Sequence, residues 1–141
     1  MHETPFGSPT RRILLAGAFA ALPTLGLSQG RPVITLLGDS ITAGYGLPAS
    51  AALPAQLQAQ LRRLGSSAIV RGAGVSGDTT AGGLARVDFS VQRDTSLCVV
   101  ALGGNDLLQG LDPKRTRANL EKIIARLKAR RIKVVLAGLQ P

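Results

Sequence analysis

The 141-residue sequence is poor in the residues that form cross-links, metal sites and aromatic binding surfaces. It contains one cysteine, Cys98, which excludes an internal disulfide. It contains no tryptophan, one tyrosine and three phenylalanines, so the basic side chains are not interleaved with aromatic ones. His2 is the only histidine, and no group of His, Cys and Asp has the spacing of metal ligands. We therefore expect no metal and no other cofactor.

Acidic residues are also scarce, with 8 Asp and Glu against 17 Lys and Arg, which gives a net charge of +9. A positive charge of this size suggests nucleic acid or an anionic membrane surface as a candidate partner. We interpret the charge as a solvated helix face and expect no nucleic-acid partner, because no nucleic-acid-binding motif accompanies it. The clustered basic residues are Lys114, Arg115, Arg117, Lys122, Arg126, Lys128, Arg130, Arg131 and Lys133.

The first 30 residues have the pattern of an export signal. Arg11 and Arg12 precede an apolar run, residues 13–27, which is too short and too interrupted by Gly and Pro to span a bilayer securely. Gly26-Leu27-Ser28 matches the small-x-small pattern that a signal peptidase cleaves, and the paired arginines suit the twin-arginine route. We predict a signal peptide over 1–30, with an uncleaved anchor as the alternative. The domain over 31–141 is then periplasmic or secreted, and it meets the membrane only transiently through the signal peptide.

The rest of the chain alternates between strand and helix patterns. Short apolar runs over 33–37, 68–71, 97–102 and 133–139 predict four strands. Asp112 followed by Pro113 predicts a helix start, and residues 78–87 predict a shorter helix. Strands that alternate with helices indicate parallel pairing in a layered α/β sheet. The two apolar helix stripes are Leu53, Leu57, Leu61 and Leu64, with Pro54 in the first turn, and Leu120, Ile123, Ile124 and Leu127.

Polar, glycine-rich segments follow the first three expected strands, at 38–40, 74–78 and 103–106. Ligands of parallel sheets bind at the carboxyl ends of the strands, so we expect these three segments to converge. Ser40 lies on a tight turn there, and the side-chain amide of Asn105 and a glycine N–H lie on the neighbouring loops. Three hydrogen-bond donors around one serine are what the oxyanion of acyl transfer requires.

The same three segments resemble the sequence blocks of a known family, the SGNH (GDSL) hydrolases. Gly38-Asp39-Ser40-Ile41-Thr42, Ser76-Gly77-Asp78-Thr79 and Gly103-Gly104-Asn105-Asp106 resemble its first three blocks in order. The amino-acid sequences of residues 43–46 and 83–86 are similar to those of the family's bacterial acyl-thioesterase, lysophospholipase and arylesterase branch. The resemblance covers residues 33–141 and implies a flavodoxin-like three-layer α/β/α fold with a parallel sheet.

The resemblance implies a serine esterase or lipase-type hydrolase that acts on small-molecule carboxylic esters or thioesters. Ser40 corresponds to the nucleophile. The N–H groups of Ser40 and Gly77 and the side-chain amide of Asn105 correspond to the oxyanion hole, and Asp106 to a brace for the Asn105 loop. A complete family member is expected to be a monomer.

One block of the family has no counterpart in these residues. The family's Asp-x-x-His pair supplies the general base, and His2 is the only histidine of the sequence. A serine hydroxyl is a poor nucleophile without a base to take its proton. We therefore expect a C-terminally truncated chain with little or no turnover.

Two other functions remain open. Residues 72–77 spell G-x-G-x-x-G after an expected strand, which is the fingerprint of dinucleotide-binding modules, although it follows the second strand and not the first. Alternatively, the cleft binds acyl groups or carbohydrate without catalysis, and Ser40 only caps a helix.

Overall fold

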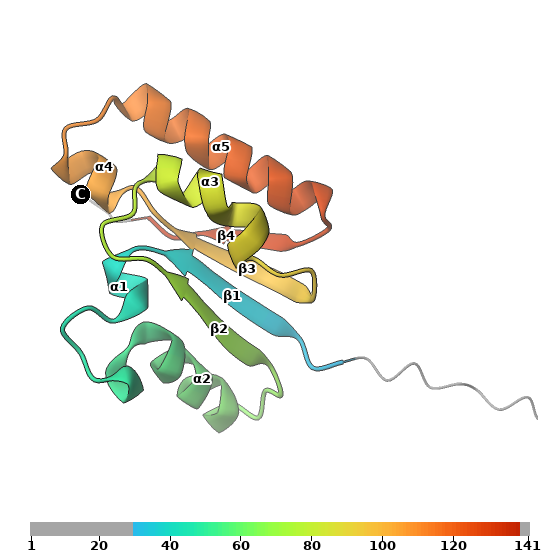
Figure 1. Cartoon of the computed structure of the whole chain (residues 1–141). Helices are drawn as coiled ribbons and strands as arrows, with labels where there is room; N and C mark the ends of the chain where they lie inside the picture. Colours follow the sequence, from blue (N-terminus) through green and yellow to red (C-terminus); the bar gives the residue numbers. More distant parts are fainter. Residues whose placement is uncertain (1–29, 139–141) are drawn as a thin grey trace, which may run out of the picture.

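The computed structural model describes residues 30–138, which form a parallel four-stranded sheet between two layers of helices (Figure 1). The expected signal segment lies outside the described residues, except for Gly30. The sheet order is β2-β1-β3-β4, which is the beginning of the flavodoxin-like order 2-1-3-4-5. The expected three-layer α/β/α fold is therefore confirmed. The strands are β1 (Val33–Gly38), β2 (Ile69–Gly74), β3 (Thr95–Ala101) and β4 (Lys133–Leu136).

The helices divide between the two faces of the sheet. Helix α2 (Leu53–Arg63) packs against β2 on one face, whereas α3 (Thr80–Ser90) and α5 (Pro113–Ala129) lie side by side on the other (Figure 1). Three short elements were not predicted, namely α1 (Ser40–Ala43), the 3₁₀ turn η1 (Ala49–Ala51) and α4 (Gly104–Leu108). Within residues 30–138, no helix combines the length and the apolar character that crossing a membrane requires.

Side-chain caps fix where α3 and α5 begin. The Asp112 carboxylate accepts a hydrogen bond of 2.9 Å from the Lys114 N–H, and Pro113 occupies the first helical position, as predicted. Helix α3 begins two residues later than expected, because the Thr79 hydroxyl accepts from the Gly82 N–H and so makes Thr79 the cap. It also continues past residue 87, to Ser90.

The main hydrophobic core lies between the sheet and the α3–α5 layer. Cys98 on β3 is fully buried in this core, and burial raises the pKa of its thiol to about 11. Cys98 is therefore a protonated, unreactive core side chain near neutral pH, as its place on an expected strand suggested. The other core members are Leu37, Val87, Val91, Val100, Leu102, Ile123, Leu127 and Ile132.

Two of the predicted apolar segments are less buried than their patterns suggested. Leu64 was expected on the apolar stripe of α2, but it lies just past the end of the helix and is 81% exposed. Strand β4 ends at Leu136, within the range expected for it, and pairs only with β3 among the described residues. Val135 and Leu136 on this edge strand are each about half exposed.

Candidate active site

The carboxyl ends of the first three strands lie at one level because β1 pairs in register with both of its neighbours. Gly38 is opposite Gly74 on β2 and opposite Ala101 on β3. Beyond the last pair, the Val75 N–H donates to the Gly38 carbonyl at 3.0 Å, which holds the second loop against the first. The convergence of the three loops that the sequence predicted is therefore present.

Ser40 is the first residue of α1, directly after the buried carboxylate that caps this helix. The Asp39 Oδ1 atom accepts from the Ile41 N–H at 3.0 Å, so Asp39 shapes the turn. At the other end of α1, Gly44 adopts a positive φ of 77° and its N–H donates to the Ser40 carbonyl. Within residues 30–138, neither the N–H nor the hydroxyl of Ser40 has a hydrogen-bond partner. The α1 turn fixes the backbone of Ser40, and both of these groups remain available to a ligand.

Gly77 presents its N–H from a tight turn between β2 and α3. The Asp78 N–H donates to the Val75 carbonyl at 3.1 Å, and Gly77 is the third residue of the turn, with φ of 83°. Glycine adopts this left-handed conformation without the strain that a Cβ atom would cause. Gly77 is exposed, and its N–H has no acceptor in the described part of the chain.

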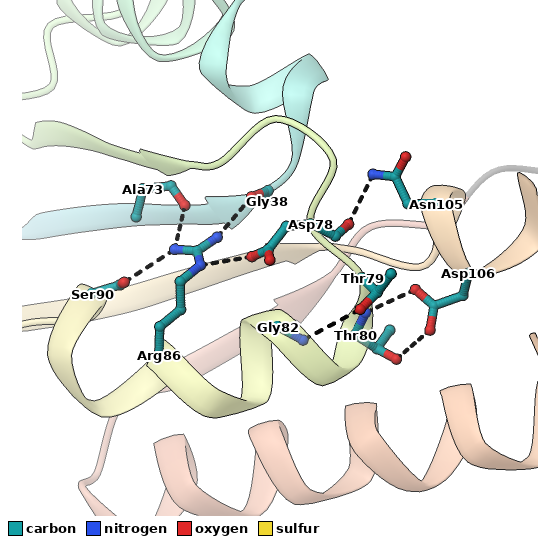
Figure 2. A network of polar contacts seen from close by, with 10 residues as sticks. All are labelled: Gly38, Ala73, Asp78, Thr79, Thr80, Gly82, Arg86, Ser90, Asn105 and Asp106. Atoms are coloured by element: carbon teal, nitrogen blue, oxygen red, sulfur yellow. Dashed lines mark hydrogen bonds and ion pairs between the residues drawn. The ribbon is translucent and has the colours of Figure 1, made fainter. Parts of the chain in front are cut away.

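Asn105, on α4, is joined to the loop that carries Gly77. Its Nδ2 atom donates to the Asp78 backbone carbonyl at 2.8 Å (Figure 2). A primary amide carries two N–H groups, so this bond orients the side chain and leaves one N–H for a ligand. The three residues predicted as oxyanion donors therefore lie on loops that are hydrogen-bonded to one another, and each retains an N–H that can be donated.

Asp106 is the buried centre of a second polar cluster, behind Asn105. Its Oδ2 atom accepts from the Thr80 N–H at 2.8 Å, and its Oδ1 atom accepts from the hydroxyls of Thr80 and Thr116 at 2.5 and 3.1 Å. The Asn119 amide donates to the Thr80 hydroxyl at 3.1 Å. These bonds tie α4 to the start of α3 and to α5, so Asp106 braces the loop that carries Asn105. Figure 2 shows the part of the cluster that joins Asp106 to Thr80.

Arg86 on α3 is the polar residue that the sequence reasoning missed. The sequence showed it only as the last residue of a family-like tetrapeptide, whereas the structure gives its guanidinium contacts with both β1 and β2 (Figure 2). Two of its four hydrogen-bond partners are backbone carbonyls, which no sequence pattern marks.

The first two glycines of the G-x-G-x-x-G segment have a packing role, and the third, Gly77, serves the turn described above. Gly72 and Gly74 lie inside β2, where a Cβ on Gly72 would lie 2.9 Å from Pro54 Cγ and one on Gly74 only 2.3 Å from the Ala43 nitrogen. These glycines let α1 and α2 approach the edge strand closely. Their presence therefore needs no bound nucleotide to explain it.

A cavity of about 380 Å³ lies beside the candidate site. Asp39, Ile41 and Thr42 line it on one side and residues 101–104 of the third loop on the other, with Leu53, Leu107, Ala137 and Gly138 completing the wall. Ser40, Gly77 and Asn105 are not among its lining residues. Within residues 30–138, no group of three or more His, Cys, Asp or Glu side chains is placed to hold a metal ion.

The buried Asp106 cluster yields a prediction about stability. We expect Asp106→Ala to lower the free energy of unfolding by roughly 3 kcal/mol, because a buried donor left without an acceptor costs about 1–3 kcal/mol and Asp106 accepts from three. Asp112→Ala is the matched control, since it removes an exposed capping carboxylate and should cost only about 1 kcal/mol. Urea denaturation measures both values, and an equal loss in the two variants would contradict the bracing role.

Comparison with known proteins finds consistent similarity. Residues 36–141 match the model of the GDSL-like Lipase/Acylhydrolase family. Esterase TesA of Pseudomonas aeruginosa is 38% identical over 131 residues, which cover 92% of this chain and 65% of TesA. The protein named thioesterase 1/protease 1/lysophospholipase L1 of Escherichia coli K12 is 41% identical over 97 residues, which cover 68% of this chain and 45% of that protein.

A solved structure agrees with these sequence matches. The crystal structure of AlinE4, described as an SGNH-hydrolase family esterase, superposes with a TM-score of 0.74 at 47% identity. The superposition covers 78% of this chain and 60% of AlinE4. The chain thus spans less than two thirds of the length of each of these three proteins.

Proposed function

We propose, from the premise that this chain belongs to the GDSL-like Lipase/Acylhydrolase family, that Ser40 is the nucleophile of a hydrolase for small carboxylic esters or thioesters. One observation carries the proposal. The N–H groups of Ser40 and Gly77 and one N–H of the Asn105 amide are free of partners within residues 30–138 and lie on three hydrogen-bonded loops around one serine. The names of the relatives, esterase and thioesterase/lysophospholipase, agree with this class of substrate.

The proposed reaction is acyl transfer through the serine. The Ser40 hydroxyl oxygen bonds to the carbonyl carbon of the ester while its proton passes to a base. The carbonyl oxygen becomes an oxyanion, which accepts hydrogen bonds from Ser40, Gly77 and Asn105. The bond to the alcohol or thiol then breaks, and water releases the acid from the acyl-enzyme.

The base is the one part that these 141 residues do not supply. His2 is their only histidine, and it lies outside the described residues. In the family pattern, a histidine of an Asp-x-x-His block takes the serine proton. We therefore propose that these residues supply the nucleophile and the oxyanion donors of the reaction and not the general base.

A Ser40→Cys variant tests the oxyanion donors without the base, because a thiol with a pKa near 8.5 ionises unaided. At pH 8.5, p-nitrophenyl acetate should acylate the new thiol and release about one equivalent of p-nitrophenolate. Adding Asn105→Ala should slow this step at least about tenfold, since losing one oxyanion donor costs about 10²–10³ in turnover in complete enzymes. Stopped-flow absorbance measures the rate, and the unmutated chain serves as the blank because the buried Cys98 thiol, with a pKa of about 11, stays protonated.

Alkylation by iodoacetamide is the internal control for the Ser40→Cys experiment. Displacement at a saturated carbon develops no oxyanion, so Asn105→Ala should leave the alkylation rate within about twofold. The ratio of the acylation rate to the alkylation rate then reports oxyanion stabilisation alone. If Asn105→Ala leaves this ratio unchanged, Asn105 is not an oxyanion donor and the proposed function is wrong.

The unmutated chain leads to a separate prediction. We expect it to hydrolyse p-nitrophenyl acetate at a rate close to that of Ser40→Ala, because general base catalysis typically supplies about 10²–10⁴-fold and the family's Asp-x-x-His block has no counterpart in these residues. Adding imidazole to both proteins should reveal a difference between them, since imidazole can take the serine proton. A clear excess of hydrolysis over Ser40→Ala without imidazole would show that the chain already contains a base.

We also propose that residues 1–30 direct export, which makes the domain periplasmic or secreted and lets it meet the membrane only in transit. The paired arginines and the apolar run support this. Fractionation of a Gram-negative host that expresses the chain should recover the domain in the periplasm, shortened near Ser28. Arg11→Lys together with Arg12→Lys keeps the positive charge, so it should block export only if the twin-arginine route is used. Recovery of the full-length chain in the cytoplasm would contradict the export signal.

A further inference from the structure

We propose that Arg86 is a positioning residue, whose guanidinium fixes the Gly77 and Asn105 donors relative to Ser40. This inference rests on the proposed function, since it assigns a role within the same site. Figure 2 shows Arg86 extending from α3 toward the carboxyl ends of β1 and β2. It makes no contact with the donors themselves and acts through the residues that it holds.

The guanidinium of Arg86 has four hydrogen-bond partners, which lie on β1, on β2, in the loop after β2 and on α3. Nη2 donates to the Gly38 carbonyl at 2.9 Å, and Nη1 donates to the Ala73 carbonyl and the Ser90 hydroxyl, each at 3.0 Å. Nε donates to Asp78 Oδ2 at 2.7 Å. Gly38 lies two residues before Ser40, and Ala73 lies in β2 just before the loop that carries Gly77. The planar group therefore joins the ends of the two strands from which the serine and the glycine are presented.

Asp78 passes this constraint on to the donors. It directly follows Gly77, and its backbone carbonyl accepts from Asn105 Nδ2 at 2.8 Å. Its carboxylate is fixed by Arg86 and lies so close to Gly82 that a Cβ there would approach Asp78 Oδ1 to 2.1 Å. One residue thus receives the ion pair on its side chain and orients Asn105 with its main chain. A change in the position of Asp78 would move the Gly77 N–H and the Asn105 amide together.

The arrangement depends on the shape of the guanidinium as well as on its charge. The side chains of Arg86 and Asp78 are only 18% and 14% exposed, so solvent cannot replace lost hydrogen bonds freely. Five N–H donors in a rigid plane can serve acceptors on several sides, whereas a lysine ammonium is a single point at the end of a flexible stem. Arg71 and Asp94 form a comparable ion pair at 2.8 Å that is more exposed and contacts none of the three loops.

The test compares Arg86→Met, Arg86→Lys and the control Arg71→Met, each added to Ser40→Cys. The readout is the ratio of acylation by p-nitrophenyl acetate to alkylation by iodoacetamide, with thermal unfolding followed in parallel. We expect Arg86→Met to lower the ratio about tenfold or more, since a misplacement of about 1 Å can cost about 100-fold. Arg71→Met should leave the ratio unchanged. Arg86→Lys should recover little of the loss, because it keeps the charge near Asp78 but not the contacts with Gly38 and Ala73.

Either of two results would overturn the assignment, namely an unchanged ratio in Arg86→Met or full recovery in Arg86→Lys. If Arg86→Met does not fold, Asp78→Ala decides instead, because it removes the ion pair and keeps the backbone carbonyl that orients Asn105. A lowered ratio in Asp78→Ala supports the role, and an unchanged ratio overturns it. If Asn105→Ala also has no effect on the ratio of the Ser40→Cys parent, the proposed function fails and the role of Arg86 fails with it. If Asn105→Ala lowers the ratio but Arg86→Met does not, the proposed function stands and only the positioning role of Arg86 is rejected.

Discussion

The parallel pairing of β1 with strands on both sides decides where the three loops of the candidate site lie. Gly38 is level with Gly74 and with Ala101, so three loops leave the sheet at one edge and at one height. The reversal of strand order on either side of β1 is the position where open α/β sheets bind ligands. Small residues at these strand ends let the loops lie close together, as the close approach of Gly74 to α1 shows.

Two carboxylates, Asp78 and Asp106, then hold the loops in their relative positions. Asp106 accepts only N–H and hydroxyl donors, whereas Asp78 pairs with the guanidinium of Arg86. Both carboxylates are largely buried, and burial of this kind is stable only where hydrogen-bond partners are supplied. The proposed oxyanion donors differ from these carboxylates, because each has an N–H without a partner in the described part of the chain. Satisfied carboxylates therefore support loops that carry unsatisfied donors, which is the arrangement that the proposed site requires.

The sequence predicted the layers, the four strands and the meeting of the three loops, because alternating apolar runs and glycine-rich turns are local patterns. It also predicted the start of α5 from Asp112 and Pro113. It missed α1 and α4, which are too short to show a helical period and which form where the strand ends place them. It missed the role of Arg86 because two of its four partners are backbone carbonyls, 13 and 48 residues away. Leu64 fits the helical stripe by spacing, yet it lies beyond the last turn of α2.

The long sequence separations within the site also have a consequence for the order of folding. The bonds from Arg86 to Gly38, from Asn105 to Asp78 and from Thr80 to Asp106 close loops of 48, 27 and 26 residues. A contact between residues far apart in sequence forms only after a long loop has closed, and this closure is entropically unfavourable. Such contacts therefore form later than the turns of a helix such as α5. A refolding chain would regain most of its helix signal before the loops that carry Ser40, Gly77 and Asn105 had come together. The chemistry proposed for this serine thus depends on the completed tertiary structure, and the same hydroxyl in the nascent chain is an ordinary alcohol.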